Sequence, residues 1–222
     1  MKEIPRWYLF LIITFPLSAL VNLAIKRHIL LALISIFNIN ESPKFWPFWF
    51  LPIANLIAPL TEEPIKILPI IFTEARDSLK EKRRAYILGL LLGAGFGIGE
   101  AWYLAISFTL TKPEYAFGLF FDLIGFFSER FLVVIVHGLL TAVLLFGFKK
   151  SFVKYFFIAV GFHYLLNIGA ALYQRGILSI WATTVPLLLS LLIFLKYVFK
   201  IEQQLRRESL LLTTKEIFWT KD

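Results

Sequence analysis

Long runs of apolar residues, separated by short charged clusters, dominate the chain. A helix needs about 20 such residues to cross the hydrocarbon core of a bilayer, so the pattern predicts an all-α polytopic transmembrane helix bundle. About six, or at most seven, spans are expected. The apolar stretch 29–37 is too short to cross the bilayer alone, so it either extends the first helix or lies re-entrant. Firm spans are expected at about 7–25, 48–72, 85–110, 130–148, 152–173 and 177–199.

The same pattern sets the expected domain organisation. Residues 1–200 are expected to form a single transmembrane domain, because no soluble domain or internal repeat interrupts the spans, and the topology of the first 45 residues stays open. Residues 111–129 are expected to be a longer connection, rich in phenylalanine. Residues 201–222 combine charges with apolar patches, which is typical of a juxtamembrane tail that lies on the membrane surface as an amphipathic helix.

The second firm span is unusual because it carries both prolines and charges. Its prolines remove backbone donors and tend to kink a helix. Glu62, Glu63 and Lys66 lie in the middle of the span, and charged side chains at that depth typically mark a functional site. The prolines are Pro52, Pro59, Pro64 and Pro69.

Composition excludes several classes of protein. With 59% hydrophobic residues and a mean hydropathy of +0.75, the chain has too much apolar surface for a soluble fold of its length. It contains no cysteine, which excludes disulfides, thiolate metal sites and a cysteine nucleophile.

The net charge of +8 is read as a topology signal, and no nucleic-acid partner is expected. The basic clusters lie between the apolar runs, and in a six-span arrangement those at 2–6, 76–84, 149–154 and 200–207 share one face. By the positive-inside rule that face is cytoplasmic, which predicts a multi-pass protein of the cell membrane with both termini in the cytoplasm. Lys26 and Arg27 fall on the opposite face in this arrangement. The apolar run before them is read as an uncleaved first span.

Glycines in the third firm span predict close helix packing. Gly89, Gly93 and Gly97 recur at four-residue spacing, and such stripes of small residues let helices approach backbone to backbone. Glu100 follows on the same helix. Its carboxylate is therefore expected where this helix is tightly packed.

Five ionisable residues lie within the predicted spans: Glu62, Glu63, Glu100, His137 and His163. A charge at the bilayer centre costs about 2.5–3.5 kcal/mol on insertion scales, so scattered placement would be costly. A rise of about 1.5 Å per residue puts all five at overlapping depths, and we expect them to share one polar interior site. Asn167 lies four residues after His163, on the same helix face. By the same spacing, Lys66 is expected to pair with Glu62.

These residues fall into motifs that resemble the PrsW-type glutamate-dependent intramembrane proteases. The string Glu62-Glu63-x-x-Lys66 resembles the first motif of that family, and the glycine-rich stretch ending at Glu100 resembles the second. Arg130, His137 and Thr141 resemble the third, and His163-x-x-x-Asn167 the fourth. Ala101 stands where family members often have asparagine, and Ile67 stands where the related CAAX prenyl endopeptidases have arginine.

The resemblance implies an intramembrane endopeptidase whose substrate is a membrane-anchored protein. Peptide hydrolysis needs an activated water and support for the oxyanion. Glu63 or Glu62 is the expected general base, Glu100 completes the cavity, and the remaining site residues His137, His163 and Asn167 orient the water or stabilise the oxyanion. The residues leave metal dependence open: two histidines with carboxylates are ligands that zinc accepts, whereas no His-Glu-x-x-His motif is present.

Two other functions are consistent with buried carboxylates and histidines. A proton-coupled small transporter also uses such groups, although transporters commonly contain repeated halves that this chain lacks. A non-catalytic membrane scaffold of the same fold would use the polar cluster only to lock helices together. The residues alone do not distinguish Glu62 from Glu63 as the base, and they do not specify the oligomeric state.

Overall fold

The computed structural model describes residues 8–111, 120–179 and 181–219, and within them no residue forms a β-strand. The all-α prediction is therefore confirmed for the described residues. The elements are α1 (Tyr8–Leu20), the π-helical η1 (Val21–Lys26), α2 (Arg27–Ile36), η2 (Pro43–Phe45), α3 (Phe50–Ile71), η3 (Glu74–Lys80), α4 (Lys82–Thr111), α5 (Phe120–Phe146), α6 (Phe148–Gln174), η5 (Trp181–Thr183) and α7 (Thr184–Trp219).

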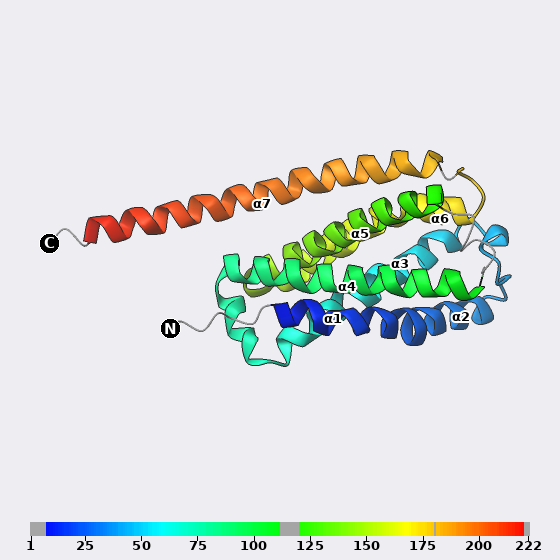
Figure 1. Cartoon of the computed structure of the whole chain (residues 1–222), viewed down its shortest axis with the longest axis horizontal. Helices are drawn as coiled ribbons and strands as arrows, with labels where there is room; N and C mark the ends of the chain where they lie inside the picture. The colour runs from blue at the N-terminus through cyan, green and yellow to red at the C-terminus, as the bar shows by residue number, and fades with distance from the viewer. Residues whose placement is uncertain (1–7, 112–119, 180, 220–222) are drawn as a thin grey trace.

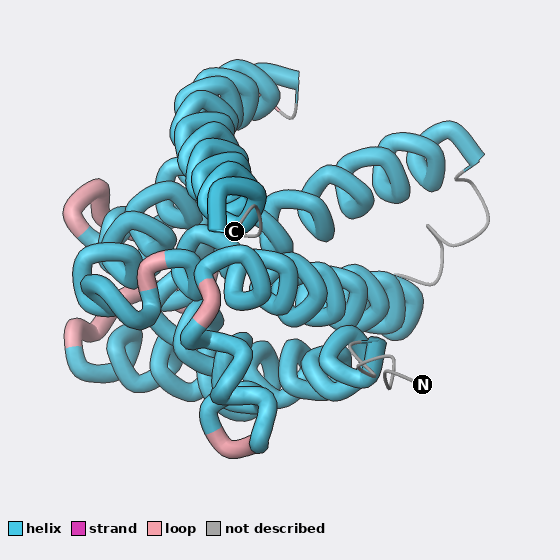
Figure 2. Tube along the Cα trace, turned by 90° about the vertical axis from the view of Figure 1, so that its left-hand side faces the viewer, coloured by secondary structure: helices cyan, strands magenta, loops and turns pink. Residues whose placement is uncertain are grey.

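The long helices run along one axis of the molecule (Figure 1). Helix α7 lies along the top of this view, and its C-terminal end extends past the other helices. Figure 2 looks along the bundle, with α7 seen nearly end-on. Buried apolar residues of α4, α5, α6 and α7 form one core cluster, and those of α3, α4, α5 and α6 form another.

Three helical segments are long and apolar enough to cross a membrane: Ile12–Ile36, Lys82–Ser107 and Phe148–Gln174. A shorter apolar helical segment covers Arg130–Phe146. Their length and composition support membrane association of this protein. Helix α3 continues through Pro59, Pro64 and Pro69 without ending.

The first helix is longer than the expected first span. Helices α1, η1 and α2 follow one another without a break from Tyr8 to Ile36, so the stretch 29–37 extends the first helix and is not re-entrant. The interpretation of Lys26 and Arg27 as residues at a membrane boundary was wrong. Lys26 ends the π-helical turn in the middle of a candidate span, and π-helical turns occur often at functional sites.

Two other boundaries differ from the sequence prediction. The connection expected at 111–129 is shorter, because α4 continues to Thr111 and α5 begins at Phe120. The residues between them lie outside the described part. The last helix has no break between the expected span and the tail, since α7 runs continuously from Thr184 to Trp219.

The glycine stripe of α4 brings α4 and α5 into backbone contact. A Cβ atom added at Gly93 would lie 2.0 Å from the carbonyl oxygen of His137, and one at Gly89 would lie 2.5 Å from the Cα atom of Ala142. On another face, a Cβ at Gly99 would lie 2.2 Å from the carbonyl oxygen of Phe15 on α1. Helix α4 is thus packed tightly against two helices, one of which carries His137.

Adding a methyl group at Gly93 is expected to destabilise the protein. Because the Cβ of Gly93→Ala would clash with the backbone at His137, α4 and α5 must separate, at a cost of about 1–3 kcal/mol in the free energy of unfolding. Gly161→Ala is the matched control, since nothing lies within 4 Å of the added Cβ. Thermal unfolding of both variants measures the effect. Equal melting temperatures would contradict the packing argument.

Candidate functional site

The expected polar site forms where four helices and the π-helical turn meet. Glu62 and Glu63 come from α3, Glu100 from α4, His137 from α5 and His163 from α6. Four of these five side chains are buried, and Glu100 keeps 14% of its side chain exposed. Hydrogen bonds and ion pairs connect all five. The predicted convergence is therefore present in the structure.

Glu63 lies at the centre of this network. Its Oε1 atom accepts a hydrogen bond of 2.6 Å from the ammonium group of Lys66 and one of 2.7 Å from Nδ1 of His163. Lys66 and Glu63 are both fully buried. The sequence prediction that Lys66 pairs with Glu62 was wrong, because the lysine reaches the carboxylate three residues away and not the one four residues away.

His137 links Lys66 to Glu100. Its Nδ1 atom lies 2.8 Å from the Lys66 ammonium nitrogen, and its Nε2 atom lies 3.0 Å from Oε2 of Glu100. An ammonium group can only donate hydrogen bonds, so Nδ1 accepts and Nε2 donates to the carboxylate. These two partners define the tautomer of His137 and leave neither ring nitrogen free. The ring also packs edge-on against Phe96, over which the Lys66 ammonium lies.

Lys26 is a member of the site that sequence reasoning missed. The π-helical turn brings its ammonium nitrogen 2.7 Å from Oε1 of Glu62 and 4.0 Å from Oε1 of Glu100. Its side chain is 22% exposed, whereas that of Glu62 is 1% exposed. The sequence does contain an indication of this role. The predicted spans hold three carboxylates but only one lysine close to them in sequence, Lys66, so a further cation is expected nearby.

Two lysines partly balance the three carboxylates. The ammonium groups of Lys26 and Lys66 pair with the three carboxylates, and Arg130 of α5 also acts electrostatically on Glu100. Because buried charges are tolerated only when they are paired and hydrogen-bonded, the network explains how these residues can share an apolar interior.

Two carboxylate oxygens stand out because they lack partners. Oε2 of Glu62 and Oε2 of Glu63 are buried and accept no hydrogen bond from the described residues. Nε2 of His163 lies 3.7 Å from Oε2 of Glu62, beyond hydrogen-bond distance. Since His163 uses Nδ1 to donate to Glu63, Nε2 is the acceptor nitrogen of the neutral ring. These atoms can hold a small polar ligand such as a water.

Asn167 is close to the site along the helix but does not join the network. It is half-buried on α6, one turn after His163, and within the described residues its side chain makes no hydrogen bond to the five ionisable groups. Thr141 uses its hydroxyl to donate to the backbone oxygen of His137. It therefore fixes the helix turn of His137 and does not face the carboxylates.

A divalent ion fits these residues only in part. Glu62, His137 and His163 each offer a ligand atom, and these atoms lie within 4.8 Å of one another. Zinc takes nitrogen and oxygen ligands at about 2.0–2.2 Å, so the three groups would need to move closer. His137 would also have to release Lys66 or Glu100.

Comparison with protein-family models, curated proteins and solved structures found no match. The resemblance to PrsW-type proteases therefore rests on the four motifs alone. The site geometry is an independent observation, because the distances between these side chains were not part of the motif comparison.

Proposed function

We propose that this protein is an intramembrane endopeptidase that hydrolyses a peptide bond of a membrane-anchored protein with a water activated by glutamate and histidine. The observation that carries the proposal is the buried Oε2 atom of Glu62, which accepts no hydrogen bond from the described residues and lies 3.7 Å from the acceptor nitrogen of His163. A purely structural network would be expected to satisfy such groups within the protein. Oε2 of Glu63 is a second buried oxygen without a hydrogen-bond partner among the described residues.

The proposed water lies between Oε2 of Glu62 and Nε2 of His163. The 3.7 Å between these two atoms lets one water donate a hydrogen bond of about 2.8 Å to each. Its oxygen then keeps lone pairs for attack on a carbonyl carbon. Glu63 accepts a hydrogen bond from Nδ1 and so orients the His163 ring with Nε2 toward the water. The negative charge of Glu63 also stabilises the imidazolium that forms when Nε2 takes a proton.

Hydrolysis then follows in two steps. The water oxygen bonds to the carbonyl carbon, the carbonyl oxygen takes the electron pair of the double bond, and one water proton passes to Glu62 or His163. In the second step, that proton passes to the amide nitrogen as the carbon–nitrogen bond breaks. The products are a new carboxyl terminus and a new amine. Lys26 and Asn167 are the candidates to donate to the oxyanion, because both border the site and His137 has no free nitrogen.

The proposed topology is six spans with both termini in the cytoplasm. Counting Tyr8–Ile36 as one span, the described part contains six long helices. The basic residues of 76–84, 149–154 and 200–207 then share one side, which the positive-inside rule makes cytoplasmic. Because Lys26 and Arg27 lie within the first helix, they no longer oppose this arrangement.

The first experiment identifies the substrate. New protein N-termini are compared in membranes from cells that express the wild-type chain, Glu63→Gln or Glu41→Gln, a loop carboxylate that is exposed. We expect new termini near the membrane segments of anchored proteins with the wild type and with Glu41→Gln, and none with Glu63→Gln. Identical sets of termini in all three would contradict the proposal.

The same variants distinguish the other two functions. A proton-coupled transporter would carry protons into liposomes that hold a pH-sensitive dye, and Glu63→Gln would abolish that flux. A scaffold would show neither cleavage nor flux, and Glu63→Gln would only lower its melting temperature. Under the proposal, the wild-type protein cleaves and does not dissipate a pH gradient.

Lys26 is expected to position Glu62. Lys26→Met leaves the buried Oε1 atom of Glu62 without its cation, and removing one member of a buried pair costs about 3–5 kcal/mol. We expect the lower end of this range, because the lysine side chain is 22% exposed, together with slower cleavage. Lys26→Arg should restore both in part. Arg27→Met is the matched control, since the neighbouring Arg27 is exposed; equal effects at both positions would refute this role.

A further inference from the structure

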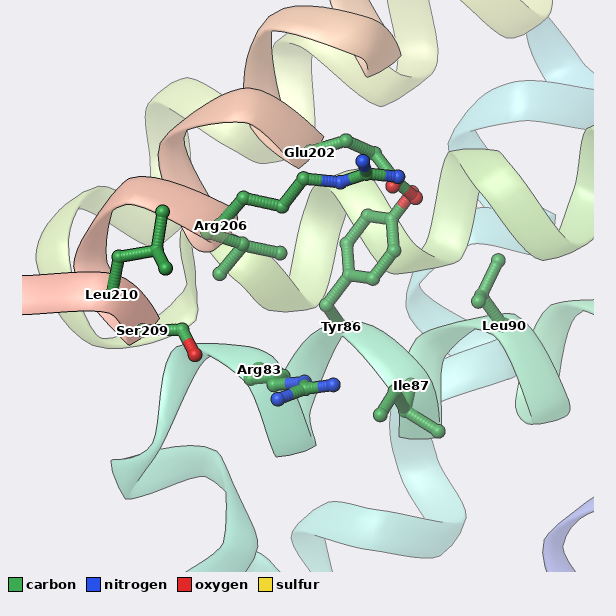
Figure 3. Close-up of a pocket in the computed structure, with 9 residues that line it drawn as sticks. Arg83, Tyr86, Ile87, Leu90, Glu202, Arg206, Ser209 and Leu210 are labelled. Carbon is green, nitrogen blue, oxygen red and sulfur yellow. The ribbon is translucent and has the colours of Figure 1, made fainter. Parts of the chain in front are cut away.

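A cleft of about 540 Å³ opens between the start of α4 and the C-terminal half of α7. This volume is within the range of about 300–1,000 Å³ that is typical of small-molecule sites. Figure 3 shows side chains of the two helices facing one another across it. It is lined by Arg83, Tyr86, Ile87, Leu90, Glu202, Leu205, Arg206, Ser209 and Leu210.

Two polar contacts between the helices frame the cleft. The hydroxyl of Tyr86 donates a hydrogen bond of 3.2 Å to Oε1 of Glu202, and the ammonium group of Lys82 lies 2.6 Å from Oε1 of Glu208. The Lys82 hydrogen bond also holds the pKa of the Glu208 carboxyl below its usual range, so this ion pair persists at neutral pH. The two helices are therefore tied on both sides of the cleft.

The cleft lining carries two arginines, one from each helix. Arg83 and Arg206 are both exposed, and neither forms an ion pair or hydrogen bond within the described residues. Among the described residues of the lining, Glu202 is the one acidic group; it accepts a hydrogen bond from Tyr86, and Figure 3 shows the Arg206 side chain extending toward it. The lining therefore keeps a net positive charge, with Arg83 facing no acidic residue of the lining on its own helix. Two guanidinium groups on opposite helices suit an anion with several oxygens, because arginine matches phosphate geometry with paired hydrogen bonds.

The rest of the lining is apolar and continues along the membrane span. Ile87 and Leu90 follow Arg83 along α4, inside the candidate span that begins at Lys82. Leu205 and Leu210 are the apolar residues that α7 contributes to the lining. A small soluble anion has no apolar part to pack against these residues, whereas a lipid has an acyl chain that can. Basic pockets between helices at the cytoplasmic membrane surface are a known arrangement for acidic lipid headgroups.

We propose that this cleft binds one anionic glycerophospholipid, with its phosphate between Arg83 and Arg206 and the start of an acyl chain along Ile87 and Leu90. The bound lipid bridges α4 and α7. Because α7 and the N-terminal part of α4 do not contribute to the buried carboxylate site, the inference is independent of the proposed function.

The test is lipid binding to the purified full chain in neutral detergent, followed by native mass spectrometry and by thermal unfolding. The probes are phosphatidylglycerol, phosphatidylcholine and soluble glycerol phosphate. One phosphatidylglycerol is expected to bind each chain and raise Tm. The double variant Arg83→Gln/Arg206→Gln should bind it about 30-fold more weakly, because each arginine at a membrane surface contributes about fivefold in affinity.

The matched control is Arg84→Gln/Arg207→Gln, which removes the same charge from the neighbouring positions of the same two helices. Both of these arginines are exposed and lie outside the cleft lining, so this variant should keep the wild-type affinity. Equal weakening in both double variants would overturn the proposal in favour of general surface attraction. Equal affinity for phosphatidylcholine, or for glycerol phosphate, would also overturn it, the latter by showing a site for free phosphate.

Discussion

Glu63→Gln is expected to reduce the rate of substrate cleavage by about 10²–10⁴-fold, the range that a general base and its partner typically contribute. The amide keeps the size of the side chain and can still accept from Lys66, so the helices should still assemble, although the melting temperature should fall because the buried ammonium of Lys66 loses its counter-ion. What is lost is the negative charge that faces Nδ1 of His163. Glu62→Gln should have a similar effect, because Glu62 contacts the proposed water directly, whereas Glu63 acts on it through His163. The rates are measured with purified protein in liposomes.

The double variant sharpens this prediction. Groups that act on one water are strongly non-additive, so Glu62→Gln/Glu63→Gln should be no slower than the slower single variant. Glu202→Gln is the control, since Glu202 lies on α7 in the separate cleft. A fully active Glu63→Gln protein would remove Glu63 from the mechanism. Multiplicative losses in the double variant would show that the two carboxylates act separately.

Lys66→Met is expected to be the most destabilising single substitution in the site. It leaves the Glu63 carboxylate and Nδ1 of His137 without their shared donor, at positions that are 0% and 3% exposed. Loss of one member of such a buried pair costs about 3–5 kcal/mol. The expected result is a much lower melting temperature, with cleavage reduced even below that temperature because His163 and His137 lose their orientation.

Lys80→Met provides the comparison for Lys66→Met. Lys80 also pairs with a carboxylate three residues away, Asp77, but both side chains are more than two-thirds exposed. Exposed ion pairs contribute little to stability, so the melting temperature of the Lys80→Met protein should stay close to that of the wild type. If Lys66→Met melted like Lys80→Met, the buried network would not be what holds these helices together.

Hydrophobic periodicity predicted much of the fold, because span length and apolar runs depend on local composition. Helix α3 covers Phe50–Ile71 where a span at 48–72 was expected, and α6 covers Phe148–Gln174 where 152–173 was expected. The start of α5 at Phe120 was missed, since the charges at Asp122, Glu129 and Arg130 resemble a loop. A helix end depends on what the next residues pack against, which periodicity does not encode.

The sequence predicted which residues form the site better than it predicted which of them contact one another. The cost of isolated membrane charges predicted that Glu62, Glu63, Glu100, His137 and His163 would meet. The partners of the lysines could not be predicted in the same way. Residues three and four apart share a helix face, so the sequence does not decide between Glu62 and Glu63 for Lys66. Lys26 was assigned to a boundary because Lys26-Arg27-His28 is typical of one.

The central claim is that this chain alone hydrolyses a peptide bond with a water held at Glu62 and His163. The most direct measurement is cleavage of the identified substrate by purified protein in liposomes made in water enriched in oxygen-18, with mass analysis of the fragments. We expect one oxygen-18 atom at the new carboxyl terminus with the wild-type protein, and at least about 100-fold less of this fragment in the same time with Glu63→Gln. Intact substrate with the purified wild-type protein, or as much labelled fragment with Glu63→Gln as with the wild type, would contradict it.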